Sequence, residues 1–403
     1  MKKIASVLLI VAMLFCSAAF AEVAKEDMKI GLICLHDENM GYDANFIDSM
    51  KAALENLGMD ESQLIIKTNI PEDQGCYDAA IDLAESGCNY IFADSFGHED
   101  YIILAAEEYP EIQFSHATGT KSQSVGLENY HNAFASIYQG RFAAGYAAGL
   151  KLNEMIESGK ITEDQAKVGY VGAFPYAEVI SGLSSTFLGI RHACPSATMV
   201  VKFTNSWGDQ ALEQEAATAL IASGCVLMSE HADTVGAPTA CEDNNVPNVG
   251  YNISFNAVAP NTSLVSSRIN WTPYMQMAIE ATMKGESFPT DIALGMAEGA
   301  VELTELNPHV AAEGTVEQVQ EVLDELASGE MQVYDTSTFT VNGGMTVEEY
   351  VQTEDYLQDT ANGGFNAATH QIAAEYVKDG YFHESEFQSA PYFDLPIDGI
   401  SEG

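Results

Sequence analysis

Aromatic, acidic and amide side chains occur in this chain at the turns that follow expected strands. The stretch 204–252 has the pattern strand, helix, strand, helix and strand, and Trp207, Asp233 and Asn252 occupy its turns or its last strand end. Because such turns gather at the carboxyl edge of a parallel sheet, the three side chains are expected to face one crevice. An indole ring can stack on a flat molecule, while a carboxylate and an amide hydrogen-bond its edge. The spacing therefore predicts a small-molecule binding site.

Carboxylates at strand ends leave a second chemistry open, in which Asp43, Asp94 or Asp233 is the acid or base of a hydrolase. The sequence has no G-x-S-x-G turn, no H-E-x-x-H and no phosphate loop. It also lacks a C-x-x-C pair, and His231 with Asp233 has no third ligand at a suitable spacing. A binding protein that is not an enzyme and has no metal or cofactor is the favoured interpretation.

The first 21 residues have the pattern of a signal peptide. Lys2 and Lys3 precede the apolar run 4–15, and Ala19–Phe20–Ala21 is the small-x-small signal for cleavage. Cys16 raises the alternative of lipid attachment, but Phe15 stands where a lipid-attachment box has a small residue. Cleavage after Ala21 is favoured, which predicts export to the periplasm or the extracytoplasmic face of a bacterial cell.

The charge of the chain limits its partners. Its formal net charge is -43, so nucleic acid and anionic lipid would be repelled. Arginine occurs only at Arg141, Arg191 and Arg268, which leaves few bidentate partners for a phosphate or a multi-carboxylate ligand. A neutral or cationic small molecule fits this composition better, and no nucleic-acid partner is predicted.

The elements that must position these residues alternate along the chain. Apolar strands and amphipathic helices follow one another from Met28 to Gly119, and the pattern resumes at Lys167. Such alternation is typical of a doubly wound parallel sheet with helices on both faces. Two such sheets in succession predict an α/β protein of two lobes with a ligand cleft between them.

Six cysteines remain after the expected cleavage, and most lie in or beside apolar strands. An even number in an exported protein permits disulfides, yet a chain of 403 residues does not depend on them. Core thiols are the favoured interpretation. They are Cys34, Cys76, Cys88, Cys194, Cys225 and Cys241.

Several long runs resemble the basic membrane protein family of ABC-transporter solute-binding proteins, which includes bacterial purine and nucleoside receptors. The similarity extends over roughly residues 28–342, and its runs occur in matching order. It implies a type I periplasmic-binding-protein fold with three hinge crossings, a ligand closed between the lobes and a membrane permease as partner. The runs are IFADSFGHEDYIILAAEEYPEIQFSHATG, IYQGRFAAGYAAGL, VGYVGAFPYAEVISG, TNSWGDQALEQEAATALI and VLMSEHADTVGA.

The resemblance also implies which turns contact the ligand. Tyr42 matches the aromatic residue that covers one face of the purine, and Trp207 matches the one that covers the other. Asp43 stands where the family has an asparagine. The full set of candidates is Tyr42, Asp43, Ser95, Phe96, Thr118, Gly119, Phe174, Trp207, Asp233, Asn252 and Asn270.

One departure from the family concerns the sugar. Nucleoside receptors place an acid and a lysine against the ribose, and these positions correspond to Asn252 and Asn270. A free purine base or a related planar heterocycle is therefore favoured as the ligand. The alternatives are a nucleoside receptor and an exported nucleoside hydrolase.

The expected domain boundaries follow from the resemblance to this family. The protein is expected to be a monomer. A helix is expected over 369–377, and the aromatic end 381–393 is expected to brace either the hinge or one lobe. The ranges are a signal peptide at 1–21, a first lobe at 28–131 and 254–292, a second lobe at 132–253 and 304–340, a third hinge crossing at 293–303, and a C-terminal extension at 341–403.

Overall fold

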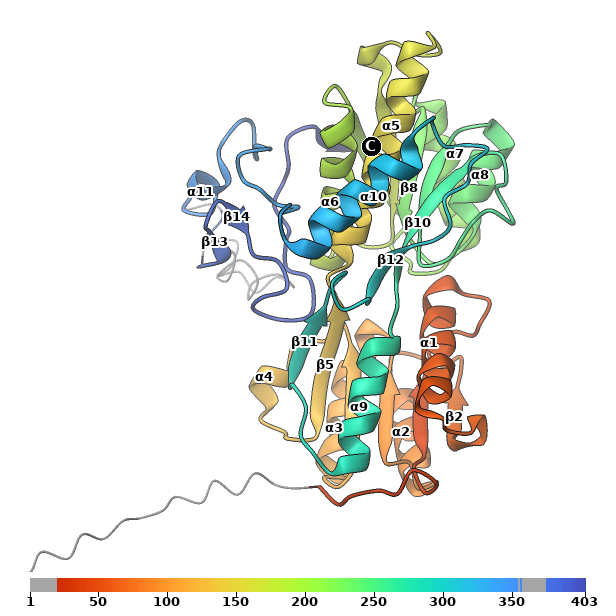
Figure 1. Cartoon of the computed structure of the whole chain (residues 1–403), viewed down its shortest axis with the longest axis vertical. Coiled ribbons are helices and arrows are strands. Elements are labelled where there is room, and N and C mark those ends of the chain that lie inside the picture. The colour runs from red at the N-terminus through yellow and green to blue at the C-terminus, as the bar shows by residue number, and fades with distance from the viewer. Residues whose placement is uncertain (1–19, 354–355, 357–374) are drawn as a thin grey trace, which may run out of the picture.

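The computed structural model describes residues 20–353, 356 and 375–403 (Figure 1). Cys16 and nearly all of the expected signal peptide, 1–21, lie outside the described residues. So does most of the helix expected over 369–377. Of its described end, residues 375 and 376 are helical, and Val377 begins a short strand.

The first lobe is built on a six-stranded sheet in which every strand pairs in parallel with its neighbours. The strand order is β11-β5-β4-β3-β1-β2. The strands are β1 (Ile30–Ile33), β2 (Leu64–Lys67), β3 (Tyr90–Ala93), β4 (Gln113–Ala117), β5 (Tyr130–Ala135) and β11 (Asp291–Leu294).

Helices cover both faces of this sheet because its strands are apolar on both sides. On β1, Ile30 and Leu32 pack with α1 and α9, whereas Ile33 packs with α2 and α3. Gly58 ends α1 with φ of 62°, in the left-handed conformation that favours glycine. The helices are α1 (Gly41–Leu57), α2 (Gln74–Glu85), α3 (Glu99–Glu108), α4 (Ser122–Val125) and α9 (Thr272–Lys284).

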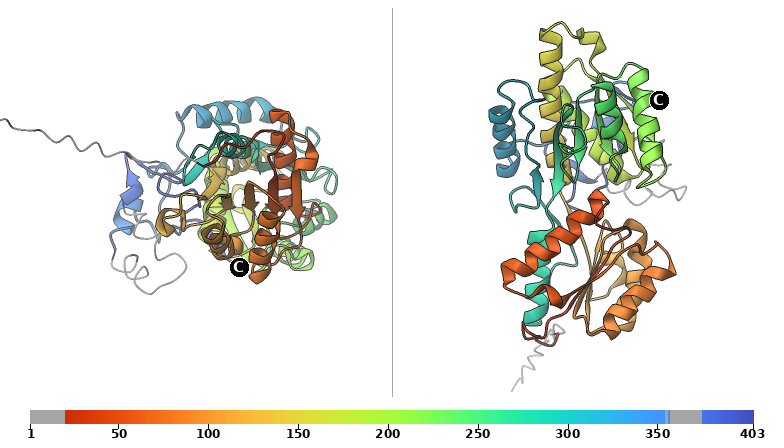
Figure 2. Two further views of the ribbon diagram at one scale, coloured as in Figure 1. Left: turned by 90° about the horizontal axis from the view of Figure 1, so that it is seen from below. Right: turned by 90° about the vertical axis from the view of Figure 1, so that its right-hand side faces the viewer.

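The second lobe lies beyond the first along the long axis of the molecule (Figures 1 and 2). Its seven-stranded sheet has the order β12-β10-β9-β8-β6-β7-β15 and is parallel except for β12. The strands are β6 (Lys167–Gly172), β7 (Thr198–Phe203), β8 (Leu227–His231), β9 (Asn248–Tyr251), β10 (Ser263–Ile269), β12 (Val301–Leu303) and β15 (Ile400–Glu402).

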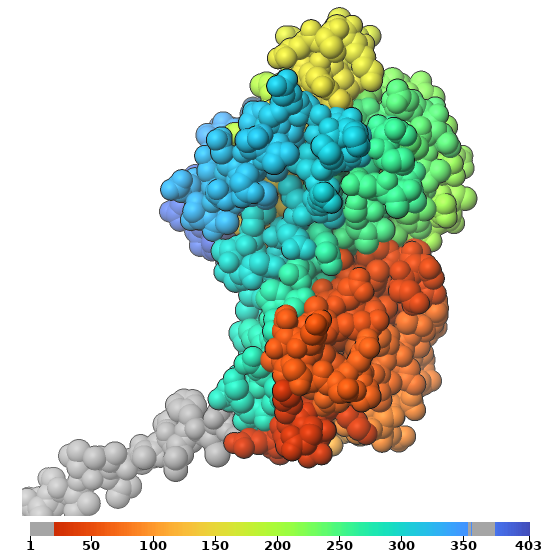
Figure 3. Space-filling view, turned by 45° about the vertical axis from the view of Figure 1, so that its right-hand side comes forward, coloured from red at the N-terminus to blue at the C-terminus, as the bar shows by residue number. Residues whose placement is uncertain are grey.

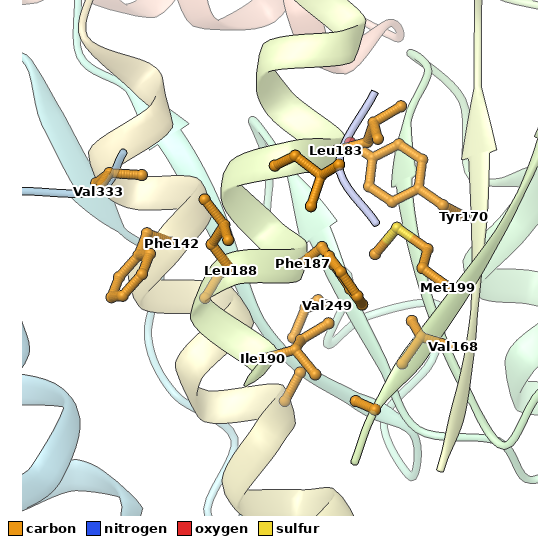
Figure 4. Packing of buried hydrophobic residues seen from close by; sticks show 14 of the residues in the cluster. Phe142, Val168, Tyr170, Leu183, Phe187, Leu188, Ile190, Met199, Val249 and Val333 are labelled. Atoms are coloured by element: carbon orange, nitrogen blue, oxygen red, sulfur yellow. The ribbon is translucent and has the colours of Figure 1, made fainter. Parts of the chain in front are cut away.

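Two pairs of helices cover this second sheet. Figure 4 shows Phe187 and Ile190 of α6 packed toward Val168 and Met199 of the sheet. The helix pair α5 and α6 packs backbone to backbone, since a Cβ added at Gly145 would lie 2.1 Å from the carbonyl oxygen of Thr186. The helices are α5 (Ile137–Glu157) and α6 (Ala177–Ala193) on one face, α7 (Gln210–Ala222) and α8 (Gly236–Asn244) on the other, and α10 (Thr315–Ser328) against α5.

Three crossings join the lobes: β5 to α5, β10 to α9, and β11 to β12. Backbone hydrogen bonds connect these crossings. The N–H of Ser136 donates to the carbonyl of Leu294, and the N–H of Asn270 donates to the carbonyl of Ala300. This is the two-lobed α/β architecture with three hinge crossings that the sequence predicts.

Two expected boundaries are wrong. The segment 263–269 was expected to rejoin the first lobe, but β10 pairs with β9 in the second sheet, so the second crossing lies near Asn270. An apolar run such as 263–269 has the same sequence pattern in either sheet, so only its strand pairing shows which sheet contains it. The residues 132–135 belong to β5 of the first lobe, where the polar His131 and Asn132 obscure the strand pattern.

The C-terminal extension packs on the second lobe, and β15 extends the sheet by pairing with β7. Its aromatic residues Phe382, Tyr392 and Phe393 join the core around α5 and α6. The extension also contains α11 (Val347–Tyr350) and the hairpin strands β13 (Val377–Lys378) and β14 (Tyr381–Phe382).

All six cysteines in the described part of the chain are buried free thiols, as the sequence favours. Within the described ranges, no helix combines the length and the apolar character needed to cross a membrane.

Candidate ligand-binding site

The carboxyl ends of the two sheets face each other across a narrow cavity between the lobes. Turns that follow strands, together with the first residues of α1, supply most of its lining, as the parallel topology requires. From the first lobe come Leu35, His36, Tyr42, Asp43, Ser95, Phe96 and Thr118. From the second come Glu178, Trp207, His231, Asp233 and Tyr251.

Aromatic rings from both lobes meet at this cavity. Phe174 and Tyr176, which follow β6, lie parallel with ring centroids 5.0 Å apart. Trp207, in the turn after β7, meets Phe174 edge to face at 5.1 Å. Phe96 of the first lobe reaches Tyr176, with centroids 5.8 Å apart. The four rings form an aromatic wall that spans the two lobes. Of the four, Phe96 and Trp207 line the cavity, where they could contact a flat ligand.

Tyr42 is a fixed part of the first-lobe lining. Its hydroxyl donates to the backbone carbonyl of Asp94 at 2.9 Å, and its ring lies 5.0 Å from that of Phe46. Burial raises the pKa of Tyr42 well above its usual value, so the phenol stays neutral.

Asp43 and Asp94 form a buried pair of carboxyl groups beneath the first-lobe lining. Asp43 accepts the N–H of His36 at 2.7 Å, and Asp94 accepts the N–H of Leu35 at 3.1 Å. Burial, and then the charge of Asp43, raise the pKa of Asp94 well above its usual value. Burial and the neighbouring charge therefore favour the protonated form of Asp94. A hydrogen bond to Asp43 raises the pKa of His36.

Cys34 lies beside this pair, and one ligand atom from each of the three residues falls within 4.8 Å of the others. Such a set could hold a cation of intermediate softness. Burial, and then the charges of Asp94 and Asp43, raise the pKa of Cys34 well above its usual value, which opposes the thiolate that such a cation requires.

The second lobe supplies further acidic groups. Burial, and then the charge of Asp43, raise the pKa of Asp233 well above its usual value. Glu178 lies 3.4 Å from Nε2 of His231. Burial lowers the pKa of His231 to about 4, so this contact is made by a neutral imidazole at pH 7.

The buried Arg141 lies behind the cavity wall. Its guanidinium carbon lies 3.7 Å from the ring centroid of Tyr251, and Nη1 donates to the backbone carbonyl of Glu230 at 2.7 Å. The ring of Tyr251 therefore stands between this cation and the cavity.

The lobes are in contact around the site (Figure 3). The N–H of Gly41 donates to the carbonyl of Asp233 at 3.3 Å. A Cβ added at Gly208 would lie 2.3 Å from the methyl carbon of Met40, so the two segments touch. The structure is thus a closed form.

Residues 30–337 match the family model described as ABC transporter substrate-binding protein, PnrA-like. The chain belongs to this family. It is 31% identical over 256 residues to a Haloferax volcanii protein named ABC transporter glucose-binding protein TsgA13, covering 64% of this chain and 61% of that protein. It is 28% identical over 281 residues to a purine-binding protein of Brucella abortus, covering 70% and 76%. A solute-binding protein of Conexibacter woesei shares the fold with a TM-score of 0.60 and 21% identity, over 76% of this chain and 98% of that one.

Most of the residues predicted for the site of this PnrA-like protein meet at the cavity, and four do not line it. Phe174 contacts the ring of Trp207, which lines the cavity, and Gly119 lies beside Glu99 and Asn132. Asn252 accepts a hydrogen bond from Asn45 of α1. Asn270 donates to the carbonyl of Gly299 and accepts the N–H of Thr272. Those that line the cavity are Tyr42, Asp43, Ser95, Phe96, Thr118, Trp207 and Asp233.

Sequence reasoning missed five lining residues. His36 and Leu35 directly follow β1, so the rule that placed Ser95 and Thr118 could have found them. His231 and Tyr251 are the last residues of β8 and β9, and Glu178 lies in the first turn of α6. Their side chains reach the cavity only because these elements are packed as they are.

Proposed function

We propose that this protein is the extracytoplasmic binding component of an ABC importer and that it closes its lobes around a planar nitrogen heterocycle, favoured as a purine base. The observation that carries the proposal is the pairing of an aromatic wall with carboxylates at one interlobe cavity. Ring stacking fits the faces of a heterocycle, and carboxylates accept hydrogen bonds from the N–H groups at its edge. The purine-binding relative in Brucella abortus supports the same class of ligand.

A free base is favoured over its nucleoside. Buried ribose hydroxyls need partners, and each group left without one costs about 1–3 kcal/mol. Asn270 is engaged at the hinge with Gly299 and Thr272, and Asn252 is engaged with Asn45. Neither amide is placed to replace the charged pair that nucleoside receptors use.

A hexose is the second candidate. The Haloferax volcanii relative is named as glucose-binding, and aromatic faces with carboxylates such as Glu178 and Asp233 also suit a sugar ring. A sugar would place its hydroxyls on the carboxylates, so glucose belongs in the same binding panel.

Mass spectrometry of the small molecules released by denaturing the purified protein is the direct test. Calorimetry with adenine, guanine, hypoxanthine, their nucleosides and glucose then ranks the candidates. The expected result is that a base binds at least as tightly as its nucleoside. A nucleoside that binds about tenfold more tightly, or about 1.4 kcal/mol, would contradict the preference for a base. Ribose release during incubation with a nucleoside would show a hydrolase instead.

A further inference from the structure

Carboxylates from the two lobes oppose one another across the cavity. Asp43 belongs to the first lobe, whereas Glu178 and Asp233 belong to the second, and all three line the same space. Burial, and then the charges of Asp43, Glu213 and Glu178, raise the pKa of Asp233, so Asp43 and Glu178 lie within electrostatic reach of Asp233. Closure of an empty cleft therefore brings like charges together.

Little positive charge on the protein offsets them. Neither lysine nor arginine is among the described residues that line the cavity. Arg141 lies behind the ring of Tyr251 and donates to the carbonyl of Glu230. Its charge opposes the rise in the pKa of Asp233, but burial and the charges of Asp43, Glu213 and Glu178 have larger effects. The hydrogen bond to Asp43 raises the pKa of His36, so this imidazole offsets part of the charge of Asp43, whereas His231 is neutral at pH 7. The cavity lining thus contains more acidic than basic groups, together with the aromatic residues Tyr42, Phe96, Trp207 and Tyr251.

We propose that the ligand binds as a cation, as a planar heterocycle whose positive charge lies between Asp43 of the first lobe and Glu178 and Asp233 of the second. This inference rests on the proposed function and specifies the class of its ligand. A cation over an aromatic face is attracted by the ring, and desolvation strengthens this attraction. Its charge also converts the repulsion between the lobes into attraction, so binding and closure favour each other.

A neutral heterocycle would not relieve this repulsion. It could donate N–H groups to the carboxylates, but their charges would still repel one another unless some of the carboxyl groups kept their protons as the lobes closed. A permanent positive charge removes that requirement and gains Coulomb energy with carboxylates of both lobes. The two ligand types therefore differ in affinity even when their shapes match.

The test compares two compounds that have the same heavy atoms and differ in charge. The permanent cation 7,9-dimethyladeninium and the neutral N6,9-dimethyladenine have the same heavy atoms, and both are titrated by calorimetry at pH 7. A second pair, 1-methylnicotinamide and nicotinamide, asks the same question without a purine. The expected result is that at least one cation binds at least about tenfold more tightly than its neutral partner.

The outcomes separate this inference from the proposed function. If neutral N6,9-dimethyladenine binds as tightly as 7,9-dimethyladeninium, the result supports a purine site and overturns the inference that the ligand is a cation. If 1-methylnicotinamide binds more tightly than nicotinamide and neither purine binds, the result supports a cationic ligand and overturns the proposal of a purine ligand. Failure of both pairs to bind would overturn the inference.

Variants of the cavity carboxyl groups test where the positive charge of the ligand lies. Glu178→Gln and Asp233→Asn should each reduce the preference for the cation by at least about fivefold. Glu215→Gln removes an equal charge from the exposed side of α7 and should leave the preference unchanged. Thermal melting checks that each variant is folded. Retention of the full preference in both cavity variants would contradict the placement of the cation.

Discussion

Asn45 of α1 donates its side-chain N–H to Oδ1 of Asn252 across the boundary between the lobes, at 2.9 Å. Both side chains are buried, at 3% and 2% exposure. Arg268 of β10 donates Nε–H to Oδ1 of Asn45 at 3.0 Å. The side-chain amide of Asn45 therefore donates one hydrogen bond to the second lobe and accepts another from it. This contact belongs to the closed form.

Replacement Asn45→Ala should favour the open form. The variant leaves Oδ1 of the buried Asn252 without this partner, and such a loss costs about 1–3 kcal/mol. Because opening relieves the cost, the ligand-free radius of gyration should increase and ligand affinity should fall. Small-angle scattering and calorimetry measure the two effects. Asn39→Ala is the control, since this exposed amide bonds only locally to Asp37. Equal scattering by the two variants would contradict the role of Asn45.

Replacement Trp207→Ala should weaken ligand binding by about 1–3 kcal/mol, the range for one aromatic ring stacked on a base. The fold should survive, because Trp207 lies in a turn and its main structural contact is to Phe174. Calorimetry on the tightest ligand of the panel measures the loss.

Trp271 provides the contrast. It is 2% exposed and stacks on Phe46 at 4.3 Å inside the first-lobe core. Trp271→Ala should cost about 3–5 kcal/mol of unfolding free energy. If Trp207→Ala instead lowers the melting temperature and leaves affinity unchanged, Trp207 is a core residue and the pocket assignment is wrong.

Glu384 in the C-terminal extension should make stability depend on pH. It accepts hydrogen bonds from Ser181 at 2.8 Å and from the N–H of Tyr392 at 3.2 Å. Burial raises its pKa from 4.5 to about 8, so between these values the folded protein keeps a proton that the unfolded chain releases. Its stability contribution is therefore full below pH 4.5 and falls as the pH rises toward 8.

The variant Glu384→Gln isolates this effect because glutamine stays neutral. Since one pKa unit corresponds to about 1.4 kcal/mol, the variant should gain a few kcal/mol over the wild type between pH 5 and pH 8. Chemical denaturation at several pH values measures the difference. The exposed Glu317→Gln on α10 is the control. A difference that does not change with pH would contradict the assignment.

Asp291 should attach the C-terminal extension to the first lobe. Its two carboxylate oxygens accept the N–H of Ser389 at 2.9 Å and the amide of Gln123 at 3.0 Å, and Gln123 also donates to the carbonyl of Phe387 at 2.7 Å. In Asp291→Ala, the amides of 387–389 should exchange hydrogen faster, while those of β15 keep their protection on the second lobe. Hydrogen exchange measures both, and unchanged exchange at 387–389 would contradict the attachment.

The sequence by itself determined the elements that depend on local pattern. Alternating strands and helices, the stop of α1 at Gly58 and the strand-end turns of Trp207 and Asp233 follow from short-range spacing. Parallel pairing then brings the ends of such strands to one edge, which is why most of the predicted residues meet at the cavity.

Only the tertiary structure decided what depends on contacts between distant residues. The apolar pattern of β10 suits either sheet, and its pairing with β9 settles which one contains it. Asn252 bonds to Asn45, which lies 207 residues away in the sequence, instead of lining the cavity. Glu178 and Tyr251 enter the lining because packing of α6 and β9 directs their side chains there, and local spacing carries no record of that packing.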